Sequence, residues 1–200
     1  MVARRPDDHL DLPAPSAKEP SVRDLLPDLL LGWREDAPAA VATVVAVRGS
    51  APREVGSALL VRADGTVLGS VSGGCVEGAV YDTALAVIAD SVPRLERYGI
   101  ADEAGIAVGL TCGGEIEVFV EPFSPASFPD FDLVADAVRR DRPLAIATVV
   151  EHPDPAVVGR RLLLHDDGVN GSLGSARRRS EEHTAELQSP MYLVCRLLLG

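Results

Sequence analysis

Lysine is almost absent from this chain. Its 200 residues contain one lysine, Lys18, and 19 basic against 30 acidic residues give a formal net charge of −11. Proteins that hold a nucleic-acid backbone do so with clustered Lys and Arg. The composition therefore argues against nucleic acid as a partner.

Long apolar segments and cysteines are also scarce. No uninterrupted apolar run approaches the roughly 20 residues of a membrane-spanning helix, and residues 1–20 contain no apolar segment of the signal-peptide type. Three cysteines without a secretory signal are more typical of free thiols or ligands than of a disulfide framework. We expect a cytoplasmic protein that has no membrane partner.

Several motifs of common enzymes and metal sites are missing. The chain contains no GxSxG, no Walker loop and no GxGxxG. His152 and His165 have no partner pattern around them and fit surface or turn positions, and the cysteines lack the spacing of a structural zinc site.

Hydrophobic patterning predicts an α/β fold. Residues 1–20 lack periodicity and are expected to form a flexible leader. Elsewhere apolar residues recur at helical spacing, alternate, or run together without charge. This pattern predicts a mixed sheet of short strands with flanking helices. The predicted helices cover residues 21–35, 76–88 and 131–140, and the predicted strands cover residues 39–47, 57–62, 66–71, 105–110 and 115–120.

A weak internal repeat divides the pattern into two similar units. The series ATVV, VG, LL, DG and GS between residues 42 and 70 recurs in the same order between residues 147 and 172. The second copy thus rebuilds a strand-loop-strand-turn-strand unit behind its own helix, but it lacks the GSAPR loop and the cysteine of the first. Two similar hairpins by chance are the alternative.

The last part of the chain departs from this pattern. RRSEEHTAELQSPMYLVCRLLLG, residues 178–200, resembles the translated read-through of a sequencing adapter, with Ala185 as a departure from the usual reading. A genuine amphipathic helix is the alternative, since its apolar residues from Leu187 to Leu198 could share one face. We leave residues 178–200, with Cys195, out of the fold prediction as an artefactual tail.

The most distinctive motif is SVSGGCVE, residues 70–77. A strand ends there, two glycines permit positive φ, and a helix begins near Cys75. The N–H groups at a helix start attract anions and favour thiolates, so Cys75 is a candidate reactive or ligating sulfur. Glu77 is a candidate proton acceptor or a favourable charge at the helix start. A structural cysteine beside an ordinary turn is the alternative.

Two further loops carry candidate ligands. TCGG, residues 111–114, places Cys112 beside a double glycine between two strands, and the two sulfurs could converge on one ligand if both loops lie at the same sheet edge. RGSAPR, residues 48–53, holds two arginines, and Arg53 near a glycine-rich helix start would complete an anion site. The alternative for Cys112 is a hairpin cysteine that only contributes to packing. The alternative for the two arginines is that they are solvated loop residues.

The three motifs in this order resemble the N-terminal region of the XdhC/CoxI family. The resemblance spans residues 22–122 and rests on GSAPREVGSALLV, DGTVLGSVSGGCVEGAV and YGIADEAGIAVGLTCGGEIEVFVEP. It implies that residues 21–123 form the N-terminal domain of that family, and residues 124–177 a second, incomplete repeat unit. Full-length relatives add a C-terminal Rossmann-like domain, whose strand-glycine-helix fingerprint is missing here. Because the chain ends in the apparent adapter sequence, we expect a truncated chain.

The resemblance implies an accessory factor rather than an enzyme. Such a factor binds molybdenum cofactor (molybdopterin) and delivers it to a molybdenum hydroxylase such as xanthine or carbon monoxide dehydrogenase. A sulfurtransferase and a second copy of the chain, forming a homodimer, are further compatible partners. Cys75 and Cys112 are also candidates for contact with the molybdenum. Carried over by position, the cofactor-binding residues are Gly49, Ser50, Arg53, Ser72, Gly73, Gly74, Cys75, Glu77, Cys112, Gly113 and Gly114.

The residue types suit this cofactor, and other functions stay open. Molybdenum cofactor is an anionic pterin phosphate with a dithiolene-bound metal, so it requires N–H donors, Arg and a soft thiolate near the metal. Cys75 with Glu77 nearby could instead make a thiol enzyme, either a sulfur carrier or an oxidoreductase. A misassembled chain without function is the third possibility.

Overall fold

The structure is a computed structural model that describes residues 22–99 and 113–174, and the backbone of residues 192–198. This part of the chain contains three α-helices, nine strands and one 3-10 turn. The elements are α1 (Leu26–Arg34), β1 (Ala39–Arg48), β2 (Ala58–Arg62), β3 (Val67–Gly69), α2 (Glu77–Asp90), β4 (Arg94–Tyr98), β5 (Glu115–Phe123), α3 (Phe131–Arg139), β6 (Leu144–Glu151), η1 (Pro155–Val157), β7 (Arg161–His165), β8 (Gly168–Gly171) and β9 (Tyr192–Leu198).

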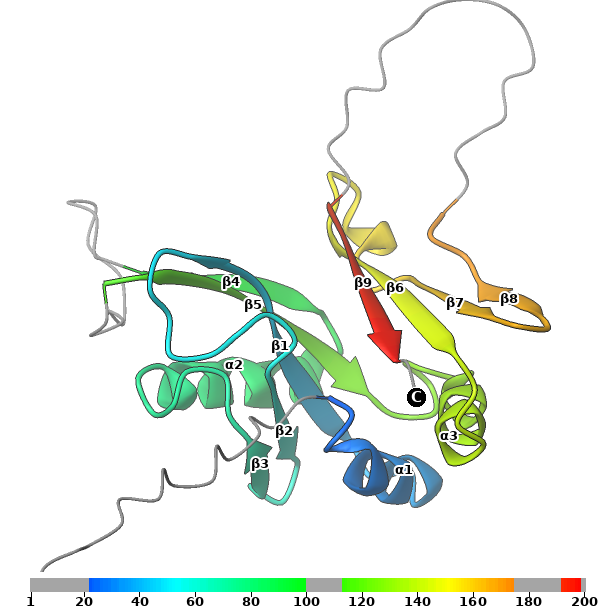
Figure 1. Cartoon of the computed structure of the whole chain (residues 1–200). Coiled ribbons are helices and arrows are strands. Elements are labelled where there is room, and N and C mark those ends of the chain that lie inside the picture. Colours follow the sequence, from blue (N-terminus) through cyan, green and yellow to red (C-terminus); the bar gives the residue numbers. More distant parts are fainter. Residues whose placement is uncertain (1–21, 100–112, 175–191, 199–200) are drawn as a thin grey trace, which may run out of the picture.

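The strands form two sheets, which Figure 1 shows with their helices. The first sheet has the order β3-β2-β1-β5-β4 and the second β8-β7-β6-β9, and every strand pairing in the described residues is antiparallel. Helix α2 lies along the first sheet, while α1 and α3 lie side by side. The predicted α/β fold with flanking helices is confirmed, with two sheets in place of one.

Strand β1 is buried on both faces, which explains why its sequence is apolar almost without interruption. One face packs on α2 and the other on α1 and α3. The residues toward α2 form the α2-side core, which comprises Ala40, Ala42, Val44, Leu59, Val61, Val71, Val76, Val80, Ala84, Val87, Tyr98, Ile116, Val118 and Val120.

A second cluster, the inter-repeat core, joins the two halves of the chain. It takes residues from α1, β1 and β2 as well as from α3, β6 and β7. Its members are Leu25, Leu26, Leu29, Ala39, Val41, Ala58, Leu60, Phe123, Phe128, Phe131, Val134, Ala137, Leu144 and Leu163. The sequence alternation of β5 is interrupted at Phe119, which is buried because this side of the sheet faces the second repeat.

The internal repeat is confirmed by matching hydrogen bonds. Gly56 N–H donates to the carbonyl of Val44 at 2.9 Å, and Gly159 N–H donates to the carbonyl of Val149 at 2.8 Å. Each first strand also changes register directly after this residue, between Val44 and Ala46 in β1 and between Val149 and Glu151 in β6. Helix α1 with β1, β2 and β3 therefore corresponds to α3 with β6, β7 and β8.

Some elements differ from the prediction. Strand β4 was not predicted, because its sequence RLERY carries three charges and forms a sheet edge. Sequence analysis leaves residues 178–200 out of the fold, whereas the structure pairs β9 with β6, in the place that β5 holds beside β1. An open edge of β6 can template such pairing. The predicted strand at residues 105–110 and the leader at 1–20 lie outside the described residues.

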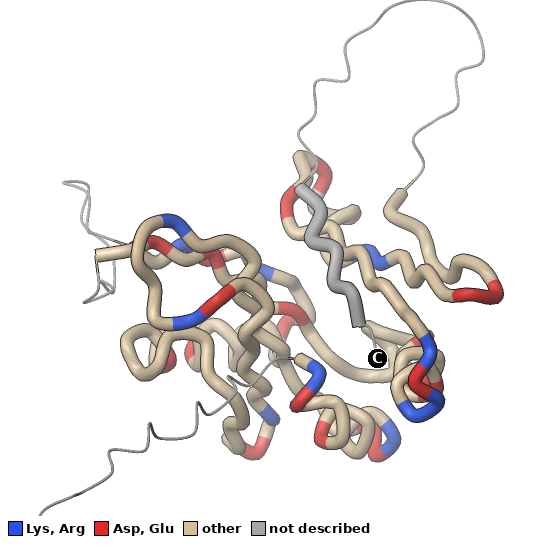
Figure 2. Tube along the Cα trace, viewed as in Figure 1, with Lys and Arg blue, Asp and Glu red and all other residues tan. Residues whose placement is uncertain are grey.

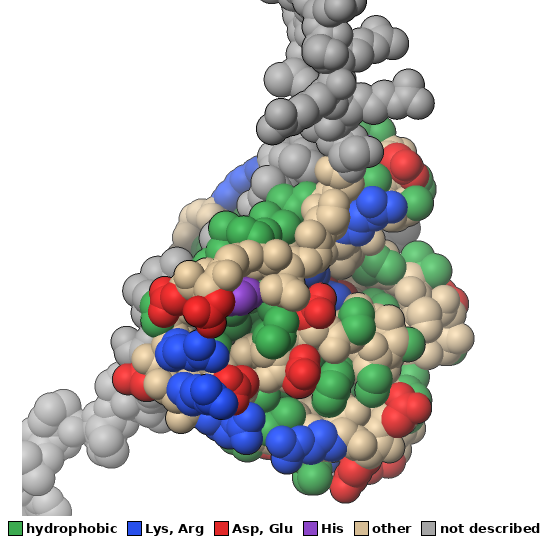
Figure 3. Space-filling model, turned by 90° about the vertical axis from the view of Figure 1, so that its right-hand side faces the viewer, with side chains coloured by type: hydrophobic (Ala, Val, Ile, Leu, Met, Phe, Trp, Pro, Cys, Tyr) green, Lys and Arg blue, Asp and Glu red, His purple; other side chains and the backbone are tan. Residues whose placement is uncertain are grey.

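Charges are distributed over the surface of both repeats. Figure 2 shows acidic and basic residues mainly in loops and near helix ends. Figure 3, seen from the side of α3, shows basic side chains gathered next to acidic ones on that face. None of the helices in the described ranges is long and apolar enough to cross a membrane.

Candidate functional site

The loop between β3 and α2 is folded around the carboxylate of Glu77. Its Oε1 accepts hydrogen bonds from the hydroxyl of Ser70 at 2.7 Å and from the backbone N–H of Ser72 at 2.9 Å. Its Oε2 accepts from the hydroxyl of Ser72 and, at 2.7 Å, from the backbone N–H of Gly74. A weaker bond of 3.3 Å comes from Val71 N–H. The chain's own carboxylate thus fills the position that an external anion would take.

These hydrogen bonds fix the protonation state of Glu77. Burial alone raises the pKa of the carboxyl, but the hydrogen bonds from Ser72 and Ser70 outweigh it and lower the pKa from 4.5 to about 2. Glu77 is therefore ionised near neutral pH and is a weak proton acceptor. The low pKa also means that the ionised form stabilises this loop.

Ser72 connects this loop to the start of α2. Its side chain is fully buried, at 0% exposure, and its hydroxyl oxygen accepts the N–H of Val76 at 2.9 Å while the hydroxyl donates to Glu77. Gly73 N–H donates to the Ser70 hydroxyl at 3.0 Å. Because both roles of the Ser72 hydroxyl are used inside the loop, its contribution is to the loop's shape.

Cys75 lies between the loop and the core. It is half-buried, forms no disulfide, and packs against the α2-side core. Gly73 and Gly74 before it have positive φ values of 69° and 109°, which favour glycine, and both are exposed. The sulfur is thus held at the inner side of a short exposed turn.

The RGSAPR loop lies against Gly114 and close to Gly73. A methyl group built on Gly114 would lie 2.0 Å from the carbonyl oxygen of Ser50, so only glycine permits this approach. A methyl group on Gly49 would lie 3.6 Å from Cα of Gly114, and one on Gly73 would lie 3.9 Å from Cβ of Pro52. The three motifs, up to 65 positions apart from Gly49 to Gly114, therefore meet at one place.

The two arginines of the RGSAPR loop differ. Arg48 is 70% exposed and lies 3.6 Å from Glu115 and 3.8 Å from Glu117 on β5. Glu117 also pairs with Arg97 at 3.2 Å, so an ion-pair chain extends along the sheet. Arg53 is half-buried.

The structure thus brings together most of the predicted site residues. Cys112 lies outside the described residues, so the predicted convergence of the two sulfurs stays a prediction. Among the described residues, no three His, Cys, Asp or Glu side chains gather in a way that could hold a metal ion. Sequence analysis missed Ser70 and the N–H of Val71 as donors to Glu77. The signal was present as serines at positions 70 and 72 before Glu77, at a longer spacing than the usual capping box.

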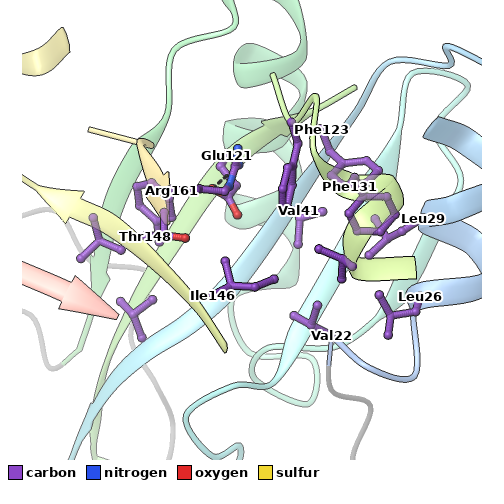
Figure 4. A pocket seen from close by; sticks show the side chains of 15 residues that line it. Val22, Leu26, Leu29, Val41, Glu121, Phe123, Phe131, Ile146, Thr148 and Arg161 are labelled. Carbon is purple, nitrogen blue, oxygen red and sulfur yellow. Dashed lines mark hydrogen bonds and ion pairs between the residues drawn. The ribbon is translucent and has the colours of Figure 1, made fainter. Parts of the chain in front are cut away.

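Two cavities lie at the junction of the repeats, and neither is lined by the three motifs. Figure 4 shows the smaller one, about 50 Å³, inside the inter-repeat core, with the ion pair of Glu121 and Arg161 at its wall. A wider cleft of about 370 Å³, also lined by Arg161, lies between Pro93 and Ser172. The smaller cavity is well below the ~300 Å³ at which ligand pockets begin.

The family model of the XdhC and CoxI family matches residues 32–99 and 137–181, which is more than half of the chain. This chain belongs to the XdhC and CoxI family. The matched segments of the family include the RGSAPR loop, Cys75 and Glu77, and they take in the last turn of α3 and the strands of the second repeat.

Three relatives are similar to part of this chain. The chain is 41% identical over 78 residues to the molybdenum cofactor insertion chaperone PaoD of Escherichia coli, which covers 39% of this chain and 24% of PaoD. It is 30% identical over 126 residues to a probable xanthine dehydrogenase subunit of Bacillus subtilis, covering 62% and 37%. An uncharacterized protein YqeB of Escherichia coli is 40% identical over 86 residues, covering 43% and 16%. The matches thus span well under half the length of each relative.

A solved structure shares the fold. A xanthine dehydrogenase from Bacillus halodurans superposes with a TM-score of 0.66 at 24% identity, covering 90% of this chain and 53% of that one. At this identity the likeness concerns the fold.

Proposed function

We propose that this chain is the part of an accessory factor that binds molybdenum cofactor and hands it to a molybdenum hydroxylase of the xanthine dehydrogenase type. Membership of the XdhC and CoxI family and similarity to a molybdenum cofactor insertion chaperone support a role in cofactor insertion. The observation that carries the proposal is the meeting of the RGSAPR loop with Gly73 and Gly114. The activity belongs in the cytoplasm, with a sulfurtransferase as a second partner and a homodimer as the acting form.

Different residues of the site fit different parts of the cofactor. Cys75, half-buried behind two exposed glycines, offers a soft sulfur for molybdenum, and Cys112 is assigned the same role. Arg53 offers a guanidinium for the pterin phosphate. Gly73, Gly74 and Gly113 leave room for the cofactor to approach the backbone, while Gly49, Ser50 and Gly114 hold two of the loops of the site against each other.

Ser72 and Glu77 have a different part in this proposal. The N–H groups of Ser72 and Gly74 already donate to Glu77, so the phosphate is not expected at this helix start. Ser72 and Glu77 instead shape the turn that presents Cys75. When bound, the cofactor supplies the metal chemistry of the receiving enzyme, and this chain holds, orients and shields it.

A thiol enzyme that uses Cys75 is the alternative. Such an enzyme needs a base that accepts the thiol proton near neutral pH. Glu77 has a pKa of about 2, far below the ambient pH, and its oxygens are occupied by hydrogen bonds. The geometry at Cys75 therefore favours cofactor binding over thiol catalysis.

The test loads the purified chain with molybdenum cofactor and measures how much stays bound after gel filtration. Cys75→Ala and Cys112→Ala are each expected to lower retention about tenfold or more, as loss of support at a metal usually does. Cys195→Ala, in β9 and outside the candidate site, is the matched control and should retain the cofactor. Unchanged retention in both site variants would remove the role assigned to the two sulfurs.

A further inference from the structure

The wider cleft at the junction of the repeats lies apart from the place where the three motifs meet. Its volume of about 370 Å³ falls within the range of ligand pockets. Strand β5 begins at Glu115, next to Gly114 of the candidate site, and reaches the cleft at Pro122 (Figure 1). The two places therefore lie at opposite ends of one strand, and a ligand in the cleft does not compete with a cofactor held at the motifs.

The first repeat closes the equivalent place with an apolar side chain. Leu25 precedes α1 as Asp130 precedes α3. A methyl group of Leu25, which is 5% exposed, lies 3.5 Å from the position of a Cβ built on Gly69. Around the equivalent Gly171 the three nearest atoms all belong to the backbone of β7, and none belongs to Asp130. The exchange of Leu for Asp thus leaves open the space that the cleft occupies.

The opposite wall of the cleft has changed in the same direction. The carbonyl of Ser57 accepts the N–H of Val44 at 3.0 Å, and the carbonyl of Arg160 accepts the N–H of Val149 at 3.0 Å, so Ser57 and Arg160 are equivalent. Ser57 is 5% exposed, whereas Arg160 is exposed and lines the cleft. On both sides of the cleft, a small or apolar residue of the first repeat is thus replaced by a charged one.

The cleft presents one open carboxylate and one open guanidinium edge. The carboxylate of Asp130 caps no N–H of α3 and has no hydrogen-bond or ion-pair partner in the part of the chain that the structure describes. Arg160 uses its Nε on the carbonyl of Ala156 at 3.0 Å, and its two terminal nitrogens have no partner among the same residues. The other two charges of the cleft, Glu121 and Arg161, neutralise each other at 2.7 Å.

We infer that the cleft binds a free α-amino acid with an apolar side chain. The carboxylate of the ligand pairs with the terminal nitrogens of Arg160, and its ammonium group pairs with Asp130. The side chain lies against the aliphatic wall, which is formed by Pro93, Pro122, Val158 and Leu163. A simple anion would gain Arg160 but be repelled by Asp130, and a simple cation would meet the reverse. A zwitterion pairs both open groups at once. This inference goes beyond the proposed function and does not depend on it.

The test compares L-leucine with two analogues that each lack one charge. Isoamylamine lacks the carboxylate, and 4-methylpentanoate lacks the ammonium group. Isothermal titration calorimetry of the full chain at about pH 7 should show that L-leucine binds and that each analogue binds about tenfold more weakly or worse, because each loses a charge-assisted hydrogen bond.

Two single variants should exchange these preferences. Asp130→Asn should weaken L-leucine binding about tenfold and tighten the binding of 4-methylpentanoate, since the repulsion on an anion is gone. Arg160→Gln should weaken L-leucine binding equally and tighten the binding of isoamylamine. The side chain of Arg139 is 61% exposed and lies outside the cleft, so Arg139→Gln is the matched control and should bind all three ligands as wild type does.

Every outcome decides for or against the amino-acid site. The exchange of preferences supports it, because a variant that had merely lost its fold would lose all three ligands together. L-leucine binding that neither Asp130→Asn nor Arg160→Gln changes overturns it, and so does equal binding of the three ligands to wild type. Wild type that binds none of L-leucine, L-methionine and L-phenylalanine at about 10 mM also overturns it. Cofactor retention is measured separately, so these results leave the delivery function untouched.

Discussion

The carboxylate of Glu77 accepts a 2.7 Å hydrogen bond from the backbone N–H of Gly74, three residues earlier in the same loop. A glycine-rich turn before a helix usually offers such N–H groups to an external anion. Here the chain supplies the anion itself. The turn that carries Cys75 is therefore shaped before any ligand arrives, and its shape depends on the charge of one side chain.

Glu77→Gln tests this dependence through pH. The carboxyl has a pKa of about 2 in the folded chain, below its ordinary value of 4.5, so unfolding takes up a proton in this range. The stabilisation from ionised Glu77 is complete above about pH 4.5 and is lost as the pH falls toward about 2. After allowance for solvent screening it amounts to about 1 to 2 kcal/mol. Urea unfolding of both proteins at about pH 6 and pH 3 measures it.

The comparison between wild type and Glu77→Gln cancels the contribution of the other carboxylates to the pH dependence of stability. Asp64 and Asp90 also have lowered pKa values, from hydrogen bonds to Thr66 and Arg94 respectively, and they titrate in both proteins alike. The gap in unfolding free energy between wild type and variant should narrow on acidification. A gap that is the same at both pH values would show that the ionised carboxylate does not stabilise the loop.

Gly114→Ala is expected to displace the RGSAPR loop. The added methyl group would lie 2.0 Å from the carbonyl oxygen of Ser50 and 3.1 Å from that of Arg48, and both are backbone atoms that cannot turn away. We expect a loss of about 2 to 4 kcal/mol in unfolding free energy, as for other overpacked buried positions. Chemical denaturation measures this loss, and cofactor retention should fall with it.

Two other glycines give graded controls. Gly113 has a φ of 74° and no atom of the described residues within 4 Å of an added methyl group, so Gly113→Ala should cost only the backbone strain of about 1 kcal/mol. Gly78 lies in α2 with open space around it, so Gly78→Ala should stabilise the chain by about 0.5 to 1 kcal/mol. The same loss at all three positions would contradict the close approach of Ser50 to Gly114.

Glu121→Ala should weaken the junction of the repeats. Arg161 donates to Glu121 at 2.7 Å and to the carbonyl of Ser127 at 2.8 Å, and the two charged side chains are only 9% and 14% exposed. Removing Glu121 leaves a buried guanidinium without its counter-charge, at a cost of about 3 kcal/mol. Thermal unfolding of the variant should show the loss.

The double variant Glu121→Leu, Arg161→Met separates charge from packing. Replacing a whole buried ion pair by hydrocarbon is often close to neutral, so this variant should be more stable than Glu121→Ala. If the double variant were the less stable of the two, the ion pair would be a net source of stability.

Sequence patterning predicted the elements that have an apolar signal. The uncharged run of β1 is buried on both faces, and the helical spacing of Val80, Ala84 and Val87 marks the buried side of α2. The repeat was visible as short identical pairs, because both copies use the same turns and the same register change. In each case burial dictates the residue type.

Features without an apolar pattern could not be predicted from the sequence. Strand β4 is an edge strand whose only buried side chain is Tyr98, so its charges hide the strand pattern in the sequence. The part played by Glu77 depends on how residues 70–74 turn back on the helix, which spacing alone does not reveal. The partner of Arg161 lies 40 positions away in another sheet. Long-range polar pairs of this kind produce no periodic pattern in the sequence.

Unfolding of the described chain should be one cooperative event. Trp33, the only tryptophan, donates from its indole nitrogen to the carbonyl of Phe128 at 2.9 Å and packs at 6.3 Å from the ring of Phe131. It therefore reports on contacts between the first repeat and the start of the second. Because the inter-repeat core takes residues from both repeats, neither half can unfold without exposing the apolar face of the other.

Trp33 fluorescence and far-UV circular dichroism should consequently give the same midpoint in a urea titration. Phe131→Ala removes a core ring that touches Trp33, Phe123 and Phe128, and should cost about 3 to 5 kcal/mol. Both signals should then shift to lower urea together, since the lost contacts belong to a shared core. A variant in which fluorescence changes first while the circular dichroism midpoint stays in place would mean that the second repeat separates from a first repeat that folds alone.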